Sequence, residues 1–262
     1  MNHSLSFDRA AGYYDQTRSI PGPIVGQGVR AILDISGAAA RILDVGTGTG
    51  RISIPLLEQG ADLVGCDLSS EMLRRLQEKL PPARILQADA SRLPFSAGHF
   101  DALLTVHVIH LIAPWQEALQ EFKRVLRTGG TYLNVRTYER AGFSIREQMR
   151  KFWREWVEAQ GGKIHQPGVG DHQVFLDELT SLGAGLEEVE VVGYSLSYTL
   201  REELGRFNDR VYSSAWQLPD EVHAASMREL RNWVDRNYGD LDRQREDEVR
   251  FVIDVARFGK DE

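Results

Sequence analysis

The chain has 262 residues, a formal net charge of −7 and a single cysteine, Cys66. Its acidic balance does not favour a nucleic acid partner, because proteins neutralise phosphates with lysine and arginine. One cysteine excludes an internal disulfide, and together with the lack of a signal peptide or a long apolar stretch it predicts a cytoplasmic protein with no membrane partner.

The first half of the chain alternates between strand and helix patterns. Helical spacing over 8–18 and 24–35 comes first, interrupted by Pro21-Gly22-Pro23. Predicted strands and helices then alternate, with strands over 41–45, 61–66, 84–87, 100–106 and 131–137 and helices over 49–59, 69–80 and 115–126. Such alternation predicts a parallel sheet with helices on both faces.

The rhythm changes after Thr137. A long aromatic-rich helix pattern covers 141–160, and a second helix is expected over 173–182. A strand over 186–200, mostly helical sequence over 202–238 and a last strand over 246–258 follow. The fold class is therefore α/β, a doubly wound, mostly parallel sheet of seven strands with helical insertions that resemble a lid.

A glycine-rich loop joins the first strand of the sheet to the next helix, in the sequence Asp44-Val45-Gly46-Thr47-Gly48-Thr49-Gly50. Glycines let the backbone approach a ligand closely, and the first N–H groups of the helix attract a carboxylate or phosphate. Dinucleotide dehydrogenases have the order G-x-G-x-x-G, whereas here the order is G-x-G-x-G and position 51 is Arg51. Asp67 closes the second strand, where an acid can accept hydrogen bonds from ribose hydroxyls. Dehydrogenases share this feature with other nucleoside-binding folds, so Asp67 alone does not distinguish between them.

Two further segments distinguish this chain from the dinucleotide dehydrogenases. Gln87-Ala88-Asp89-Ala90 ends the third strand. Further on, the predicted helix over 115–126 is closed by Gly129-Gly130 and followed by the strand over 131–137. Over roughly residues 40–137, this series resembles the class I S-adenosylmethionine-dependent methyltransferases. The small-molecule branch, with its ubiquinone and menaquinone biosynthesis methyltransferases, is the most similar, and its members have a Rossmann-like sheet.

The resemblance implies a set of cofactor contacts. The glycine loop would flank the methionine part, with Asp44 near the ammonium, and Tyr14 and Arg18 would lie near the methionine carboxylate. Asp67 would hold the ribose, and the backbone at Val106 and His107 would lie under the sulfonium. The full expected set is Tyr14, Arg18, Asp44, Gly46, Thr47, Gly48, Gly50, Asp67, Leu68, Met72, Asp89, Ala90, Val106 and His107, in which Leu68, Met72, Asp89 and Ala90 surround the adenine.

Two histidines are candidates for chemistry. His107 and His110 follow the fourth strand, where the resemblance places the methyl group and its acceptor. An unperturbed imidazole titrates near neutrality, so either could accept a proton. Methyl transfer needs a base only when the acceptor must lose a proton, so an enzyme of this branch can also work with no catalytic residue. The histidines form no zinc pattern, and no metal is expected.

The expected function is transfer of a methyl group from S-adenosylmethionine, with S-adenosylhomocysteine as product, to a small-molecule acceptor by in-line displacement. An S-adenosylmethionine-binding protein without transfer activity and an RNA methyltransferase remain alternatives. The sequence does not identify the acceptor or the atom that is methylated. Aromatic residues of the insertions would line an apolar pocket or form a flat patch that suits a homodimer.

The expected organisation is one methyltransferase domain over 1–262. Residues 1–39 form a helical segment over the cofactor, 40–137 form the cofactor-binding core, and 138–172 and 200–245 form the helical lid insertions.

Overall fold

The computed structural model describes residues 4–18, 20–139, 144–164 and 166–259. The chain divides into two compact units. The sheet unit comprises residues 1–137, 167–192 and 251–262, and the helical unit comprises 138–166 and 193–250. Each unit is described by itself below.

A seven-stranded sheet with the order β3-β2-β1-β4-β5-β7-β6 organises the fold. Its strands are β1 (Arg41–Val45), β2 (Asp62–Asp67), β3 (Ile85–Gln87), β4 (Phe100–Val106), β5 (Leu126–Glu139), β6 (Ala184–Tyr198) and β7 (Arg245–Phe258). The neighbours from β3 to β5 are all parallel. Gly185 lies opposite Arg257, and Gly193 lies opposite Val249, so β6 and β7 run antiparallel. This arrangement confirms the predicted α/β fold with a mostly parallel sheet.

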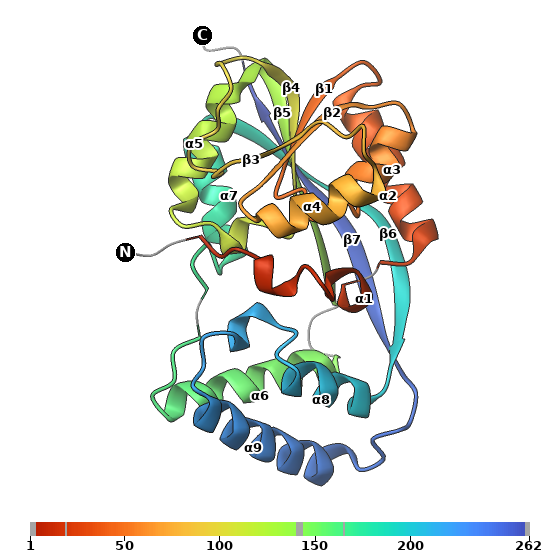
Figure 1. The fold of residues 1–262 in the computed structure, drawn as a ribbon, viewed down its shortest axis with the longest axis vertical. Helices are drawn as coiled ribbons and strands as arrows, with labels where there is room; N and C mark the ends of the chain where they lie inside the picture. Colours follow the sequence, from red (N-terminus) through yellow and green to blue (C-terminus); the bar gives the residue numbers. More distant parts are fainter. Residues whose placement is uncertain (1–3, 19, 140–143, 165, 260–262) are drawn as a thin grey trace. The chain divides into compact units, whose positions relative to one another are not determined.

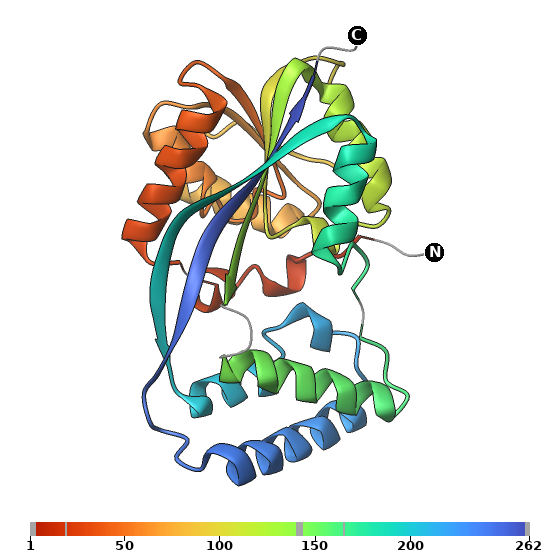
Figure 2. The ribbon, with the colours of Figure 1, turned by 180° about the vertical axis from the view of Figure 1, so that it is seen from behind.

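Helices cover both faces of the sheet, as Figures 1 and 2 show. On one face lie α2 (Gly22–Ser36), α3 (Ser53–Glu58) and α4 (Ser70–Lys79), and on the other lie α5 (Trp115–Val125) and α7 (His172–Ser181). The buried ring of Tyr132 on β5 contacts Phe122 of α5 and Phe175 of α7, with centroids 5.3 and 6.3 Å away. The doubly wound layers follow from right-handed connections between parallel strands.

Local sequence signals explain several helix boundaries. Ser69 caps α4 by accepting a hydrogen bond from the Met72 N–H at 3.1 Å, as expected for serine at this position. Helix α3 begins only at Ser53, later than the predicted start at 49, because the glycine loop continues through a turn. Pro55 therefore lies in the first turn of α3, where the missing N–H has no partner to lose.

Two further predictions were wrong. Gly129 and Gly130 do not close a helix, because β5 begins at Leu126 and contains both glycines. The register between β4 and β5 shifts there, between Phe100 and Ala102, and the irregular strand uses the positive φ of 76° at Gly129. The predicted helix over 8–18 is instead a 3-10 turn, Asp8–Ala10, followed by the short α1, Tyr14–Thr17.

The helical unit has its own apolar core between α6 (Ile145–Ala159), α8 (Leu200–Asn208) and α9 (Asp220–Tyr238). Phe152 of α6 stacks on Trp233 of α9 at 5.0 Å, and the buried Trp153 donates its indole N–H to Ser226 at 3.0 Å. These aromatic residues of the insertions therefore pack between helices of this unit. Residues 141–143 of the predicted helix lie outside the described residues, and the expected lid role of the insertions stays a prediction.

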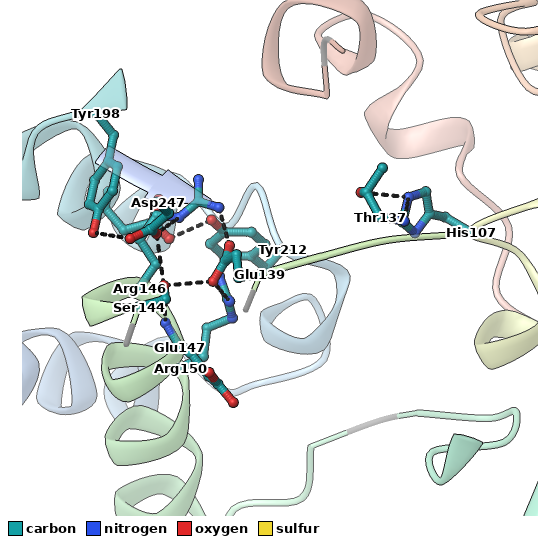
Figure 3. A network of polar contacts seen from close by, with 11 residues as sticks. His107, Thr137, Glu139, Ser144, Arg146, Glu147, Arg150, Tyr198, Tyr212 and Asp247 are labelled. Atoms are coloured by element: carbon teal, nitrogen blue, oxygen red, sulfur yellow. Dashed lines mark hydrogen bonds and ion pairs between the residues drawn. The ribbon is translucent and has the colours of Figure 1, made fainter. Parts of the chain in front are cut away.

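Buried charges tie strand ends to α6 within the helical unit (Figure 3). The Arg146 guanidinium bonds Glu139 of β5 and Asp247 of β7, and its centre lies 5.0 Å from the ring centroid of Tyr198 on β6. Asp247 also accepts hydrogen bonds from Ser144 at 2.7 Å and from Tyr198 at 3.2 Å. Each buried carboxylate therefore has a charged and a hydroxyl partner, which offsets its desolvation.

Within the residues that the structure describes, no helix combines the length and the apolar character needed to span a membrane.

Close packing of α2 on β7 yields a stability prediction. A Cβ at Gly28 would lie 2.5 Å from the Phe251 ring, whereas a Cβ at Gly26 of the same helix would meet only the flexible end of Arg30 at 3.8 Å. We expect Gly28→Ala to lower the free energy of unfolding by about 1–3 kcal/mol through overpacking. Gly26→Ala should raise it by about 0.5–1 kcal/mol, because alanine is the better helix former.

Urea denaturation of the two variants beside the wild-type protein measures both effects. Equal stability of the two variants would contradict the packing argument.

Candidate functional site

Parallel strands bring three loops to one edge of the sheet unit. Val45 of β1 pairs with Cys66 of β2 on one side and with Thr105 of β4 on the other. The loops that follow Val45, Asp67 and Val106 therefore leave the sheet side by side. A ligand at this edge is expected for open parallel sheets.

The glycine loop is held on β2 by its own amides. The N–H groups of Gly46 and Thr47 both donate to the Cys66 carbonyl, at 2.8 and 3.0 Å. Gly46 has a φ of 75°, and a Cβ there would lie 2.3 Å from Val108, so only glycine fits. Among the described residues, the atom nearest to a Cβ at Gly48 would instead be the Gly46 carbonyl oxygen at 3.9 Å, so the space beside it is open there. The loop is thus packed at Gly46 and open at Gly48.

Asp44 lies buried beneath the loop, with 1% of its surface exposed. One carboxylate oxygen, Oδ2, accepts from the Ser53 hydroxyl, which also bonds the Thr47 hydroxyl. The other oxygen, Oδ1, is buried and has no hydrogen-bond partner among the described residues. Burial raises the pKa of Asp44 to about 6, against the lowering effect of Ser53 and Thr47.

Asp67 organises the loop from the end of β2. Its Oδ2 accepts from the Gly48 N–H at 2.9 Å, and its Oδ1 accepts from the Ser69 N–H at 2.8 Å. Burial raises the pKa of Asp67, although these amides favour the charged form. The Gly48 amide is therefore engaged by Asp67 in this structure. A carboxylate has further acceptor positions for ligand hydroxyls.

Side chains of the N-terminal segment bind the glycine loop and the loop that follows β2. Asp15 accepts from the Thr49 hydroxyl at 2.5 Å and from Lys79 at 2.6 Å. Asp8 accepts from the Ser69 hydroxyl at 2.5 Å. The Leu5 N–H donates to the Leu111 carbonyl at 2.9 Å. This segment thus runs along the same edge of the sheet unit.

Tyr14 and Arg18 meet a residue that the sequence did not single out as a ligand. The Arg51 guanidinium lies 5.9 Å from the ring centroid of Tyr14 and donates to the Arg18 carbonyl. Its charge also acts on Asp44 and on His107. Arg51 directly follows the glycine loop, so its position beside Gly50 was the available signal. Only the tertiary structure shows that its guanidinium turns toward the N-terminal segment.

His107 sits in an unusual backbone conformation at the end of β4. Its φ is 55°, a left-handed value that residues with a Cβ rarely adopt. Its ring nitrogen Nε2 lies 3.1 Å from the Thr137 amide nitrogen and 3.0 Å from the Thr137 hydroxyl (Figure 3). Burial and nearby charges, with Arg51 first among them, lower its pKa to about 3. Burial and the Arg18 charge lower the pKa of His110 to about 4.

The expected adenine residues also lie at this edge. Ala88 donates its N–H to the Asp67 carbonyl at 3.0 Å, which places Asp89 and Ala90 beside the end of β2. Asp89 accepts from the Ser91 N–H and hydroxyl at 2.9 and 2.8 Å. Leu68 is half-buried. Met72 is buried, with 2% of its surface exposed, and so is Val106, which was expected under the sulfonium, with 9% exposed. The contact of Met72 with the adenine stays a prediction.

A cluster of one histidine and two acids lies elsewhere in the sheet unit. Among the described residues, His172, Glu188 and Asp254 bring ligand-type atoms within 4.8 Å of one another. Arg136 forms ion pairs with both carboxylates. Asn134 donates to Asp254 at 2.9 Å. The guanidinium thus supplies positive charge to this cluster.

Comparisons with known proteins match the part of the chain that runs from β1 to β5. The family model described as a methyltransferase domain matches residues 43–134. The demethylmenaquinone methyltransferase of Beutenbergia cavernae is 36% identical over 131 residues, which cover 47% of this chain and 53% of that protein. The ubiquinone/menaquinone biosynthesis C-methyltransferase UbiE of Syntrophotalea carbinolica is 40% identical over 136 residues, covering 48% and 57%. The chain thus spans about half the length of these curated relatives.

A solved structure extends the similarity of the fold. Phosphoethanolamine N-methyltransferase 2 of Haemonchus contortus, in complex with phosphomonomethylethanolamine and S-adenosylhomocysteine, matches with a TM-score of 0.56. The match covers 97% of this chain and 58% of that chain at 17% sequence identity. At this identity the likeness shows the fold alone.

The burial of Asp44 predicts a dependence of stability on pH. Its pKa is raised to about 6 from an ordinary value of 3.8, so the folded protein holds this proton more tightly than the unfolded chain. The free energy of unfolding therefore falls as pH rises between about 4 and 6, and the penalty is complete above that window. We expect Asp44→Asn to be more stable than the wild-type protein by about 1–3 kcal/mol at pH 8 and by little at pH 4.

Urea denaturation at the two pH values tests this expectation. Asp62→Asn is the matched control, because a hydrogen bond from Arg84 lowers the pKa of Asp62. That variant should gain no stability at pH 8. Equal stability of Asp44→Asn and the wild-type protein at pH 8 would show that the burial penalty on Asp44 is negligible.

Proposed function

Because residues 43–134 form a methyltransferase domain of the class I S-adenosylmethionine-dependent family, we propose that this chain methylates a small-molecule acceptor. The observation that carries the proposal is the Oδ1 of Asp44, which lies buried beneath an open glycine loop and has no hydrogen-bond partner in the described part of the chain. A buried carboxylate oxygen without a donor is costly, and the ammonium of S-adenosylmethionine offers a donor with the opposite charge.

The residues at the strand edge suit the rest of the cofactor. The open side of Gly48 leaves room for a ligand against the backbone. Asp67 would accept from the ribose hydroxyls, and Asp89 with the Ala90 amide would bind the adenine. Tyr14 and Arg18, with Arg51 beside them, would surround the methionine carboxylate, because guanidinium groups match carboxylates in geometry and charge.

When bound, the cofactor supplies a methyl group made electrophilic by its sulfonium. The protein then has to align the acceptor with that methyl group and keep water away. The resemblance to the family places the end of β4, with Val106 and His107, next to the expected reaction centre. A single nucleophilic displacement needs no covalent intermediate with the protein, and none of the expected residues is assigned as a nucleophile.

The names of two relatives support a class of acceptor. Both are named for menaquinone or ubiquinone biosynthesis, and one is named a C-methyltransferase. We therefore propose a quinol-type aromatic ring as the acceptor, methylated at a ring carbon. The expected cytoplasmic location and homodimer are further parts of this proposal.

Cofactor binding is the first prediction of this proposal. Titration calorimetry should show S-adenosylhomocysteine binding, with NAD much weaker. Asp67→Asn should lose about 1.5–3 kcal/mol of affinity, as expected for hydrogen bonds to a charged group. Asp62→Asn, at the opposite end of the same strand, should bind like the wild-type protein. Tighter binding of NAD would overturn the cofactor assignment.

Methyl transfer is the second prediction. With a methyl-labelled donor, a short-chain quinol that lacks its ring methyl group should take up label at carbon. The control acceptors are phosphomonomethylethanolamine and a structured RNA, which should stay unlabelled. Label on either control instead of the quinol would replace the proposed acceptor class.

A further inference from the structure

His107 has a fixed tautomer, because its neighbours leave only one arrangement of the ring proton. The Thr137 backbone N–H can only donate a hydrogen bond, and it points at His107 Nε2 at 3.1 Å. Nε2 must therefore accept, so the proton of the neutral ring resides on Nδ1. The Thr137 hydroxyl, 3.0 Å from the same nitrogen, can donate to it as well.

The main chain holds this arrangement in place. The His107 N–H donates to the Val135 carbonyl at 3.1 Å, which extends the pairing of β4 with β5 by one residue. The left-handed φ of 55° then directs the chain into the turn that carries Val108 against Gly46. Thr137 belongs to the same strand as Val135, so backbone and ring are both fixed by β5.

The second ring nitrogen is available to a ligand. In the described parts of the chain (4–18, 20–139, 144–164 and 166–259), Nδ1 of His107 has no hydrogen-bond partner. The residue is half-buried at the edge where the glycine loop begins, and Val108 next to it packs against Gly46 of that loop. Arg51, His110, Arg18 and Arg136 are the titratable or charged groups that act on the ring, and the three guanidinium groups oppose its protonation.

We infer that His107 serves as a neutral hydrogen-bond donor through Nδ1–H to the methyl acceptor, with Thr137 as the positioning residue. The acceptor must then present a lone pair to this donor, such as an ionised ring oxygen beside the nucleophilic carbon. This inference rests on the proposed function. It replaces the role of base that the sequence suggested for His107.

The chemistry balances without a base on the protein at the moment of transfer. An ionised quinol enters with its proton already lost to water. Its electron pair forms the bond from ring carbon to methyl carbon while the pair of the broken carbon–sulfur bond stays on sulfur. The ring hydrogen then leaves to water as the aromatic ring is restored. The Nδ1–H of His107 donates a charge-assisted hydrogen bond to the ionised oxygen, which favours binding of the ionised acceptor over its neutral form at neutral pH. This role needs the proton on Nδ1 to stay in place.

The tautomer can be measured without any acceptor. Long-range proton–nitrogen NMR of histidine-labelled protein at pH 7, with His107→Asn to assign the signal, should show a neutral ring protonated on Nδ1. No titration of this ring is expected between pH 5 and 8. A ring protonated on Nε2, or an imidazolium that titrates near pH 6.5, would overturn the inference.

Two variants separate a donor from a base. Asparagine and glycine both tolerate a positive φ, but only asparagine can place an N–H near the position of Nδ1. With the short-chain quinol as acceptor, His107→Gly should lower kcat/KM about tenfold or more, and His107→Asn should stay within about threefold of the wild-type value. Asparagine as slow as glycine would overturn the donor role.

Binding of S-adenosylhomocysteine to the same proteins keeps the two proposals apart. If the wild-type protein neither binds it nor labels the quinol, the proposed function fails, while the NMR measurement still decides the tautomer. If it does both and the ring is protonated on Nε2, only the inference about His107 fails.

Discussion

The parallel pairing of β1 with β2 and β4 is the constraint on which the rest of the site depends. It places Val45 between Cys66 and Thr105, so three loops begin at the same level. Residues far apart in the sequence, such as Asp67 and His107, reach one edge only through this pairing. A shift of one residue in either register would turn the paired side chains to the opposite face of the sheet.

Desolvation governs the charges at this edge in two opposite ways. Burial raises the pKa values of Asp44 and Asp67, and it lowers those of His107 and His110. Both effects favour neutral forms over charged ones. A ligand with cationic groups near Asp44 and hydroxyls near Asp67 would compensate the acids, whereas neutral imidazoles are suited to directional hydrogen bonds.

Much of the fold was predictable because its local signals are strong. The strand over 100–106 was predicted with its observed bounds, and Ser69 was one of two predicted caps of α4. The errors at Gly129 and at residues 8–18 share a cause, because a bulge and two short turns are stabilised by contacts outside the local sequence. Asp8, for example, bonds Ser69, which is 61 residues away.

The sequence alone determined the α/β class, the glycine loop and the acids that follow the strands, because these depend on periodicity and on residue type at strand ends. Tertiary structure decided which nitrogen of His107 carries the proton, since Thr137 lies on another strand. It also decided that one oxygen of Asp44 has no partner among the residues that the structure describes, and that Arg51 meets Tyr14. Hydrogen-bond direction and burial are set by neighbours in space, and spacing along the chain does not encode them.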